Sequence, residues 1–351
     1  MTQTGNPAPQ GGRIVCFGEM LLRLNPPEGE RLMQGQSLTV RPGGAEANVA
    51  VSLARFGGPT AAVSVLPDNA LGHGVRDEVR RHGVDTAGVV FKPGRMGLYF
   101  MTPGAVRRPS EVLYDRADTA FVRHADTAFD WPALLDGAAW LHVSGITPAV
   151  GPSGSRAALQ AVDAARAAGV RVSFDGNFRG KLWGEWAGDP PATLGHMLST
   201  ASLAFADERD FALVLGRAFD DPDPHARRRA AAAAAFAAFP TLERIACTLR
   251  VQESVADQAL SAVMLTRAGA EVVETRAEPI HMTGVIDRIG GGDAFAAGVL
   301  FGLWSGWPDA EALAFGLAAA GLKHSVHGDF NLFSAADVRA AMAPGGFDIR
   351  R

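Results

Sequence analysis

An aspartate that follows three consecutive glycines is the most chemically suggestive feature of the sequence. Asp293 comes directly after Gly290, Gly291 and Gly292, and an apolar, alanine-rich run of helical character follows it. Glycines let a ligand approach the backbone closely, and the first amides of a helix favour an anion such as phosphate. A carboxylate beside that anion is costly unless it has a task, such as accepting a proton from an attacking hydroxyl. Taken alone, the pattern is equally well explained by a glycine-rich turn capped by an aspartate.

A second glycine pair near the N-terminus has the same layout. Gly43 and Gly44 precede a segment in which apolar residues recur at helical spacing. Together the two stretches resemble the paired signatures of the ribokinase-like (PfkB) carbohydrate kinases, over roughly residues 13–340. Further segments are similar to the 2-keto-3-deoxygluconate kinase branch of that family, at residues 114–116, 175–179, 248–250 and 323–331.

The resemblance implies a phosphoryl-transfer site with ATP and Mg²⁺ as cofactors. In it, Asp293 takes the proton from the sugar hydroxyl, and the amides of Gly290, Gly291 and Gly292 form an anion hole around the migrating phosphoryl group. Asp287, which opens the motif, is either a turn residue or a helper that positions the magnesium phosphates. The resemblance also implies nucleotide contacts from Thr248, Arg250, Gly290 and Gly292.

Two arginines decide the expected substrate class. A sugar acid needs a planar guanidinium group to pair with its carboxylate, whereas a neutral sugar does not. The resemblance places Arg116 and Arg179 near the keto-acid end of the substrate; the alternative is that either is an arginine paired with an acid of the protein. Further substrate contacts are expected from Gly44, Asn48, Tyr99, Tyr114 and Asp329. Structural alternatives stay open for four of these residues. Asn48 is an interior polar group of a helix in that interpretation, Tyr99 and Tyr114 pack the lid, and Asp329 forms an Asx turn.

The metal-binding segment departs from the family pattern. The usual Asn-x-x-Glu motif of these kinases appears as Asp207-Glu208-Arg209-Asp210. Carboxylates can still organise hydrated Mg²⁺, so Asp207 and Asp210 are the candidate metal residues. The alternative is that the segment only begins a helix.

Composition excludes several other classes of protein. The chain has 351 residues, a net charge of −4 and no basic stripe, which argues against nucleic acid as a partner. Its apolar runs are too short to span a membrane, and its two cysteines lie in apolar segments, so we expect a reducing, cytoplasmic compartment. Glycine-rich motifs of the Rossmann or Walker type are missing, and the histidines lack the spacing of a transition-metal site.

The order of apolar segments indicates an α/β fold. Expected strands alternate with helical runs, and a late antiparallel hairpin is expected at 261–266 and 271–276. The expected core strands are 13–18, which is apolar enough to be buried on both faces, 61–66, 138–144, 170–175, 202–206 and 244–248. This order predicts a three-layer α/β/α sandwich with a mostly parallel central sheet and ligands beyond the carboxyl ends of its strands. Residues 1–12 are expected to form a disordered tail, and residues 13–345 one kinase domain with a small β lid at about 20–42 and 95–118.

These features lead to one functional hypothesis and two rivals. The hypothesis is an ATP-dependent kinase for the terminal hydroxyl of 2-keto-3-deoxygluconate, active as a dimer through the β lid. One rival is a kinase for another sugar, fructose-like or ribose-like. The other is a non-catalytic sugar-binding protein on the same scaffold, which would have no use for a base aimed at a phosphate.

Overall fold

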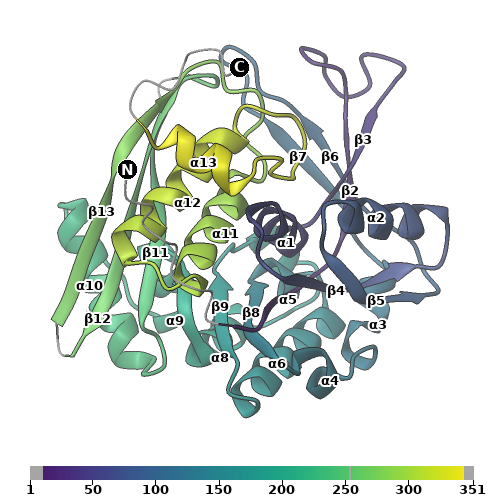
Figure 1. Cartoon of the computed structure of the whole chain (residues 1–351). Helices are drawn as coiled ribbons and strands as arrows, with labels where there is room; N and C mark the ends of the chain where they lie inside the picture. Colours follow the sequence, from purple (N-terminus) through teal and green to yellow (C-terminus); the bar gives the residue numbers. More distant parts are fainter. Residues whose placement is uncertain (1–10, 253, 270, 344–351) are drawn as a thin grey trace.

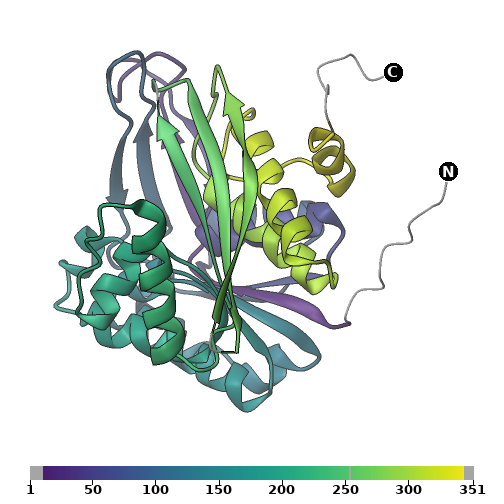
Figure 2. The ribbon, with the colours of Figure 1, turned by 90° about the vertical axis from the view of Figure 1, so that its left-hand side faces the viewer.

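The computed structural model describes residues 11–252, 254–269 and 271–343, and it has a three-layer α/β/α architecture (Figures 1 and 2). The central sheet has nine strands in the order β13-β12-β11-β10-β9-β8-β1-β4-β5. The strands from β11 to β5 in this order run parallel to one another, and β12 runs antiparallel to both of its neighbours, β11 and β13. Their bounds are β1 Arg13–Phe17, β4 Thr60–Pro67, β5 Asp85–Lys92, β8 Ala138–Ser144, β9 Arg171–Asp175, β10 Ala201–Phe205, β11 Arg244–Gln252, β12 Gln258–Ala268 and β13 Glu271–Met282.

The first strand shows why the sheet needs helices on both faces. Ile14 and Cys16 pack into one hydrophobic core, whereas Val15 and Phe17 pack into the other, and all four are buried. Because successive side chains of a strand point to opposite faces, a continuously apolar strand must be covered on both sides.

Helices from different parts of the chain cover the two faces. One core is built with α1 Ala45–Phe56, α2 Ala70–Arg81, α11 Gly291–Trp304, α12 Asp309–Lys323 and α13 Ala335–Ala341. The other is built with α3 Ala120–His124, α4 Trp131–Leu135, α5 Ile146–Ala149, α6 Pro152–Ala167, α7 Gly180–Trp183, α8 Pro190–Thr200, α9 Glu208–Leu215 and α10 Pro224–Ala238. No helix among the described residues is long and apolar enough to cross a membrane.

A second, four-stranded sheet stands at the upper right of Figure 1. Its order is β3-β2-β6-β7, with β2 parallel to β6 and the outer pairs antiparallel. The strands are β2 Leu21–Asn25, β3 Thr39–Gly43, β6 Gly97–Thr102 and β7 Glu111–Asp115. We call this sheet the lid.

Both glycine turns have a conformation that other residues rarely adopt. Gly44 precedes α1 with φ of 139°, and Gly290 precedes α11 with φ of 81°. A Cβ atom would lie 2.5 Å from the carbonyl oxygen of Glu19 at Gly44, and 2.0 Å from that of Asp329 at Gly290. Glycine is therefore required at both helix starts by backbone angle and by space. The two helices that they open, α1 and α11, pack against each other.

The expected three-layer fold with a small β lid is confirmed. Strand β5 was not expected, because its residues interrupt the apolar pattern with Gly88 and alternate between exposed and buried positions at the sheet edge. Residues 1–10 of the expected tail lie outside the described residues. Gly12, also assigned to that tail, accepts a hydrogen bond of 3.0 Å from the Trp304 indole nitrogen.

Candidate active site

The glycine turns, the lid and the carboxyl ends of the main strands meet around one cavity of about 360 Å³. Every residue expected to touch the substrate lines it, together with two glycines of the triple turn and the candidate base: Gly44, Asn48, Tyr99, Tyr114, Arg116, Arg179, Gly290, Gly292, Asp293 and Asp329. A neighbouring cavity of about 220 Å³ shares Gly292 and is also lined by Asp207, Asp210 and Thr248. Two expected residues line neither cavity: Gly291, which packs against His324, and Arg250, which is exposed on β11.

Asp293 lies in the first turn of α11, at the junction of the two glycine motifs. Asn48 of α1 donates a hydrogen bond of 2.6 Å from Nδ2 to Oδ2 of Asp293. Burial raises the pKa of Asp293 to about 6, although the Asn48 hydrogen bond lowers it. The carboxylate is therefore held in place, and its pKa is close to the value that suits a general base near neutral pH.

The start of α11 is open to a ligand on one side. A Cβ atom added at Gly292 would meet nothing within 4 Å, and Gly292 is exposed. The first amides of a helix have no carbonyl partner inside it and carry the positive end of its dipole. The turn thus presents backbone N–H groups to the cavity.

Two further carboxylates share the cavity and were not predicted as site residues. Burial raises the pKa of Glu46 to about 7, even though its Oε1 accepts hydrogen bonds from the Ser144 amide and the Thr147 hydroxyl. Burial, with the charges of Asp293 and Asp210, raises the pKa of Asp175 well above its ordinary value. Both carboxyl groups therefore hold their protons more tightly than usual, and a bound cation would favour their charged forms.

The two candidate arginines have different surroundings. Arg116 is buried, and its Nη2 atom lies 2.7 Å from Oε2 of the buried Glu19. Its charge is therefore already paired with an acid of the protein, as the alternative interpretation of this residue required. Arg179 is exposed at the cavity and makes no ion pair with an acid among the described residues; its recorded hydrogen bond goes to the carbonyl oxygen of Phe178. A ligand carboxylate in the cavity can therefore reach Arg179, and Arg288, which also lines the cavity, makes no ion pair among the described residues either.

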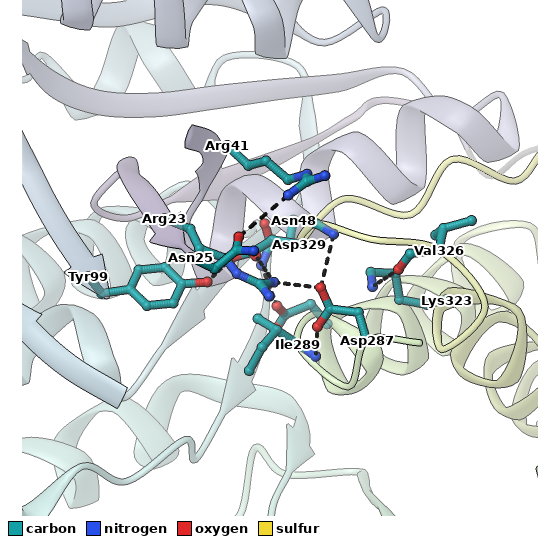
Figure 3. A network of polar contacts seen from close by, with 12 residues as sticks. Arg23, Asn25, Arg41, Asn48, Tyr99, Asp287, Ile289, Lys323, Val326 and Asp329 are labelled. Atoms are coloured by element: carbon teal, nitrogen blue, oxygen red, sulfur yellow. Dashed lines mark hydrogen bonds and ion pairs between the residues drawn. The ribbon is translucent and has the colours of Figure 1, made fainter. Parts of the chain in front are cut away.

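Tyr99 and Asp329 bind each other inside a buried polar network (Figure 3). The Tyr99 hydroxyl donates a hydrogen bond of 2.6 Å to Asp329 Oδ2, and Arg23 Nη1 lies 3.1 Å from Asp329 Oδ1 and 2.7 Å from Asp287 Oδ2. Asp287 also accepts hydrogen bonds from the backbone amides of Ile289 and Gly328. Asp287 is thus a turn residue of the glycine motif, and Arg23 connects that turn to the lid.

Asp207 and Asp210 cap helix α9. Asp207 Oδ1 accepts a hydrogen bond from the Arg209 amide, and Asp210 Oδ2 accepts one from the Asp207 amide, so the two form a capping box. No hydrogen bond reaches Asp210 Oδ1 among the described residues, and burial raises the pKa of Asp210 to about 6. The described residues contain no cluster of three or more potential metal ligands. One or two carboxylates with bound phosphates nevertheless suit Mg²⁺, so Asp210 fits a hydrated ion, and Asp175, which lines the same cavity, fits it better than the other candidate, Asp207, whose carboxylate is ion-paired with Arg209.

Replacing Asp210 with alanine should raise the Mg²⁺ concentration needed for half-maximal rate by about threefold to tenfold, because it removes a carboxylate that would face the hydrated ion. It should also destabilise the start of α9 by about 1 kcal/mol. Steady-state rates over a Mg²⁺ series, with thermal unfolding of the same variant, separate the two effects. Lower thermal stability with unchanged Mg²⁺ dependence would mean that the segment acts only as a helix cap and does not bind the ion.

The site residues that the sequence did not reveal are mostly charged side chains whose partners lie far away in the sequence. Glu46 lies between two residues of the recognised glycine motif, and Asp175 opens a recognised segment, so position alone was a signal for both. Nothing in the local sequence marks Arg23 or Glu19, whose partners lie 264 and 97 residues away.

Comparisons with known proteins agree on one family. The model of the pfkB family carbohydrate kinases matches residues 12–334. A 2-dehydro-3-deoxygalactonokinase of Haloferax volcanii is 35% identical over 340 residues, which cover 96% of this chain and 99% of that protein. The structure of a 2-dehydro-3-deoxygluconokinase of Thermotoga maritima superposes with a TM-score of 0.86 at 32% identity, covering 94% of this chain and 99% of the other. A PfkB family carbohydrate kinase of Listeria grayi gives the same four values.

Proposed function

Because the chain belongs to the pfkB family of carbohydrate kinases, we propose that it transfers the γ-phosphoryl group of ATP to the terminal hydroxyl of 2-keto-3-deoxygluconate, also called 2-dehydro-3-deoxygluconate. The observation that carries the proposal is the position of Asp293. Its carboxylate is anchored by Asn48 beside the open glycine turn and faces the same cavity as Arg179. A protein that only bound sugar would not need this base.

The chemical step follows from that geometry. Oδ2 of Asp293 is occupied by Asn48, so Oδ1 is the atom that accepts the proton from the sugar hydroxyl. As that O–H bond breaks, the oxygen forms a bond to the γ-phosphorus, and the bond from phosphorus to the β,γ-bridging oxygen breaks to release ADP. The amides at the start of α11 stabilise the charge on the migrating group. Thr248, at the neighbouring cavity, and Arg250 are the proposed nucleotide contacts.

Magnesium completes the proposed site. Asp175 and Asp210 would hold the hydrated ion, which neutralises the charge on the phosphates when it is bound. Their raised pKa values reflect two partly buried carboxylates that lack a counter-charge at contact distance. A cation in this position relieves their mutual repulsion.

The sugar-acid substrate class is supported by Arg179 and by the names of two relatives. A guanidinium group without an acidic partner, in a cavity that Arg288 also lines, favours a substrate that carries a carboxylate. One relative is named for the galacto and one for the gluco form of the same keto acid. A 37% identical match to a rice fructokinase covers only 48% of the chain, which keeps a neutral hexose as the second candidate.

The test is ADP release in a coupled assay over a panel of substrates: 2-keto-3-deoxygluconate, its galacto isomer, fructose, ribose and gluconate. We expect kcat/KM to be highest for one of the two keto acids. Faster turnover of fructose or ribose would overturn the substrate class. A chain that binds a keto acid but releases no ADP with any sugar would be a binding protein instead.

The lid is the proposed dimer interface. Val40 of β3 and Leu113 of β7 expose 53% and 60% of their surface on its outer strands, an apolar character typical of a surface that another subunit covers. Light scattering should give twice the mass of one chain, and Leu113→Asp should halve that mass.

We place the protein in the cytoplasm, where its free cysteines, Cys16 and Cys247, remain reduced.

A further inference from the structure

A buried lysine lies against the glycine turn, and the chemistry described above does not use it. Lys323 ends α12, and 0% of its surface is exposed. The chain contains 30 arginines and only three lysines. A compact ammonium group is therefore placed in the core of a protein that otherwise relies on guanidinium groups.

The end of the Lys323 side chain touches Gly290. A Cβ atom added at Gly290 would lie 3.2 Å from Cε of Lys323. In Figure 3, Lys323 lies on the side of Asp287 that faces away from Tyr99. The lysine thus supports the glycine turn from within the protein, whereas Gly292 of the same turn faces the cavity.

The ammonium group of Lys323 has few partners of its own. Nζ donates one hydrogen bond, of 3.2 Å, to the carbonyl oxygen of Val326, and no carboxylate lies within ion-pair distance among the described residues. Burial lowers the pKa of Lys323, and the nearby charges of Asp287 and Asp329 oppose that effect. Those two carboxylates are already bound by Arg23. An ammonium group has three donors, so this one retains charge that its neighbours do not neutralise at contact distance.

We propose that Lys323 is a positioning residue that supplies a fixed positive charge behind the anion hole, stabilising the phosphoryl charge through the Gly290 peptide. The inference rests on the kinase function proposed above. The simplest alternative is that Lys323 only complements the negative end of the α12 dipole. Such a role would affect folding stability and would not distinguish between ligands with and without a γ-phosphate.

Kinetics and chemical rescue test the charge directly. Lys323→Ala should lower kcat about tenfold while the KM for the sugar acid changes less than about threefold, because the charge acts on the migrating group. Propylammonium is the fragment that this truncation removes, and it should restore kcat severalfold. Lys323→Met fills the space without charge, so it should be equally slow and should not respond to the amine. Wild type and Lys92→Ala, whose lysine lies on the edge strand β5, are the controls.

Binding provides a measurement that is independent of the sugar. In calorimetry, Lys323→Met should weaken the nonhydrolysable ATP analogue AMP-PNP by about threefold to tenfold and leave AMP unchanged. If the wild type phosphorylates no sugar, the kinase proposal fails, and this measurement alone decides the role of Lys323. If Lys323→Ala does not fold, Lys323→Met with its circular dichroism spectrum takes its place. The inference is overturned if folded Lys323→Met keeps wild-type kcat and AMP-PNP affinity, or if it loses stability and rate while AMP-PNP affinity stays unchanged.

Discussion

Replacing Asp293 with asparagine should lower kcat by roughly 10²- to 10⁴-fold, the effect expected for removal of a general base. The amide has almost the shape of the carboxylate but cannot accept the proton of the sugar hydroxyl. Because Asn48 holds Oδ2 of Asp293, the replacement should keep its place in the first turn of α11. The measurement is the rate at saturating ATP and keto acid, with circular dichroism to confirm the fold. Turnover close to wild type would exclude Asp293 as the base.

The pH dependence of kcat/KM provides a second test of the same residue. The pKa of Asp293 is raised to about 6, and only the deprotonated carboxylate can take a proton, so activity should fall as the pH drops through about 6. Asp293→Asn should lack this acidic limb. Glu46, with a pKa raised to about 7, titrates nearby, so Glu46→Gln is the matched control. If the acidic limb persists in Asp293→Asn and disappears in Glu46→Gln, Glu46 is the group that titrates.

Replacing Arg179 with methionine should lower kcat/KM for the keto acid by roughly 10- to 100-fold and leave that for fructose unchanged. A hydrogen bond to a charged group contributes about 1.5 to 3 kcal/mol, and 1.4 kcal/mol corresponds to a factor of ten. Fructose has no carboxylate and therefore loses no such contact. Equal proportional losses on both substrates would mean that Arg179 is structural, and the sugar-acid assignment would then lose its support.

Arg116→Met is the informative comparison for that experiment. Arg116 is paired with Glu19 in the interior, so its removal leaves a buried carboxylate without a cationic partner and with the Thr119 hydroxyl bound to it. Breaking one side of a buried pair costs about 3 to 5 kcal/mol. We therefore expect Arg116→Met to lower the melting temperature and to reduce activity on both substrates, whereas Arg179→Met should not change stability.

Features that depend on neighbouring residues were predictable from the sequence. The two glycine turns, the helices that follow them and the buried first strand each depend on a short stretch of residues, and the structure has them where the pattern placed them. The hairpin of β12 and β13 was also expected, although both strands extend beyond their apolar centres. Local pattern identifies such elements because backbone geometry and periodicity act over a few residues.

Features that depend on distant partners were not predictable. Whether Arg116 meets a substrate or an acid of the protein depends on Glu19, which lies 97 residues earlier. Asp329 was expected to meet the substrate or form an Asx turn, and its binding to Arg23 and Tyr99 was not foreseen. A single sequence shows which side chains can pair, but tertiary packing decides which of them meet.

The position of Arg23 has a thermodynamic consequence for how the affinities for the two substrates depend on each other. Arg23 belongs to lid strand β2 and binds Asp287, which fixes the glycine turn through the Ile289 amide. The lid and the glycine turn are therefore connected by the contact between Arg23 and Asp287. If a sugar acid under the lid strengthens the contact between Arg23 and Asp287, it also stabilises the turn for ATP. By linkage, ATP must then raise the affinity for the sugar by the same factor. The two substrates should show binding synergy, visible as a KM for each that falls as the other approaches saturation.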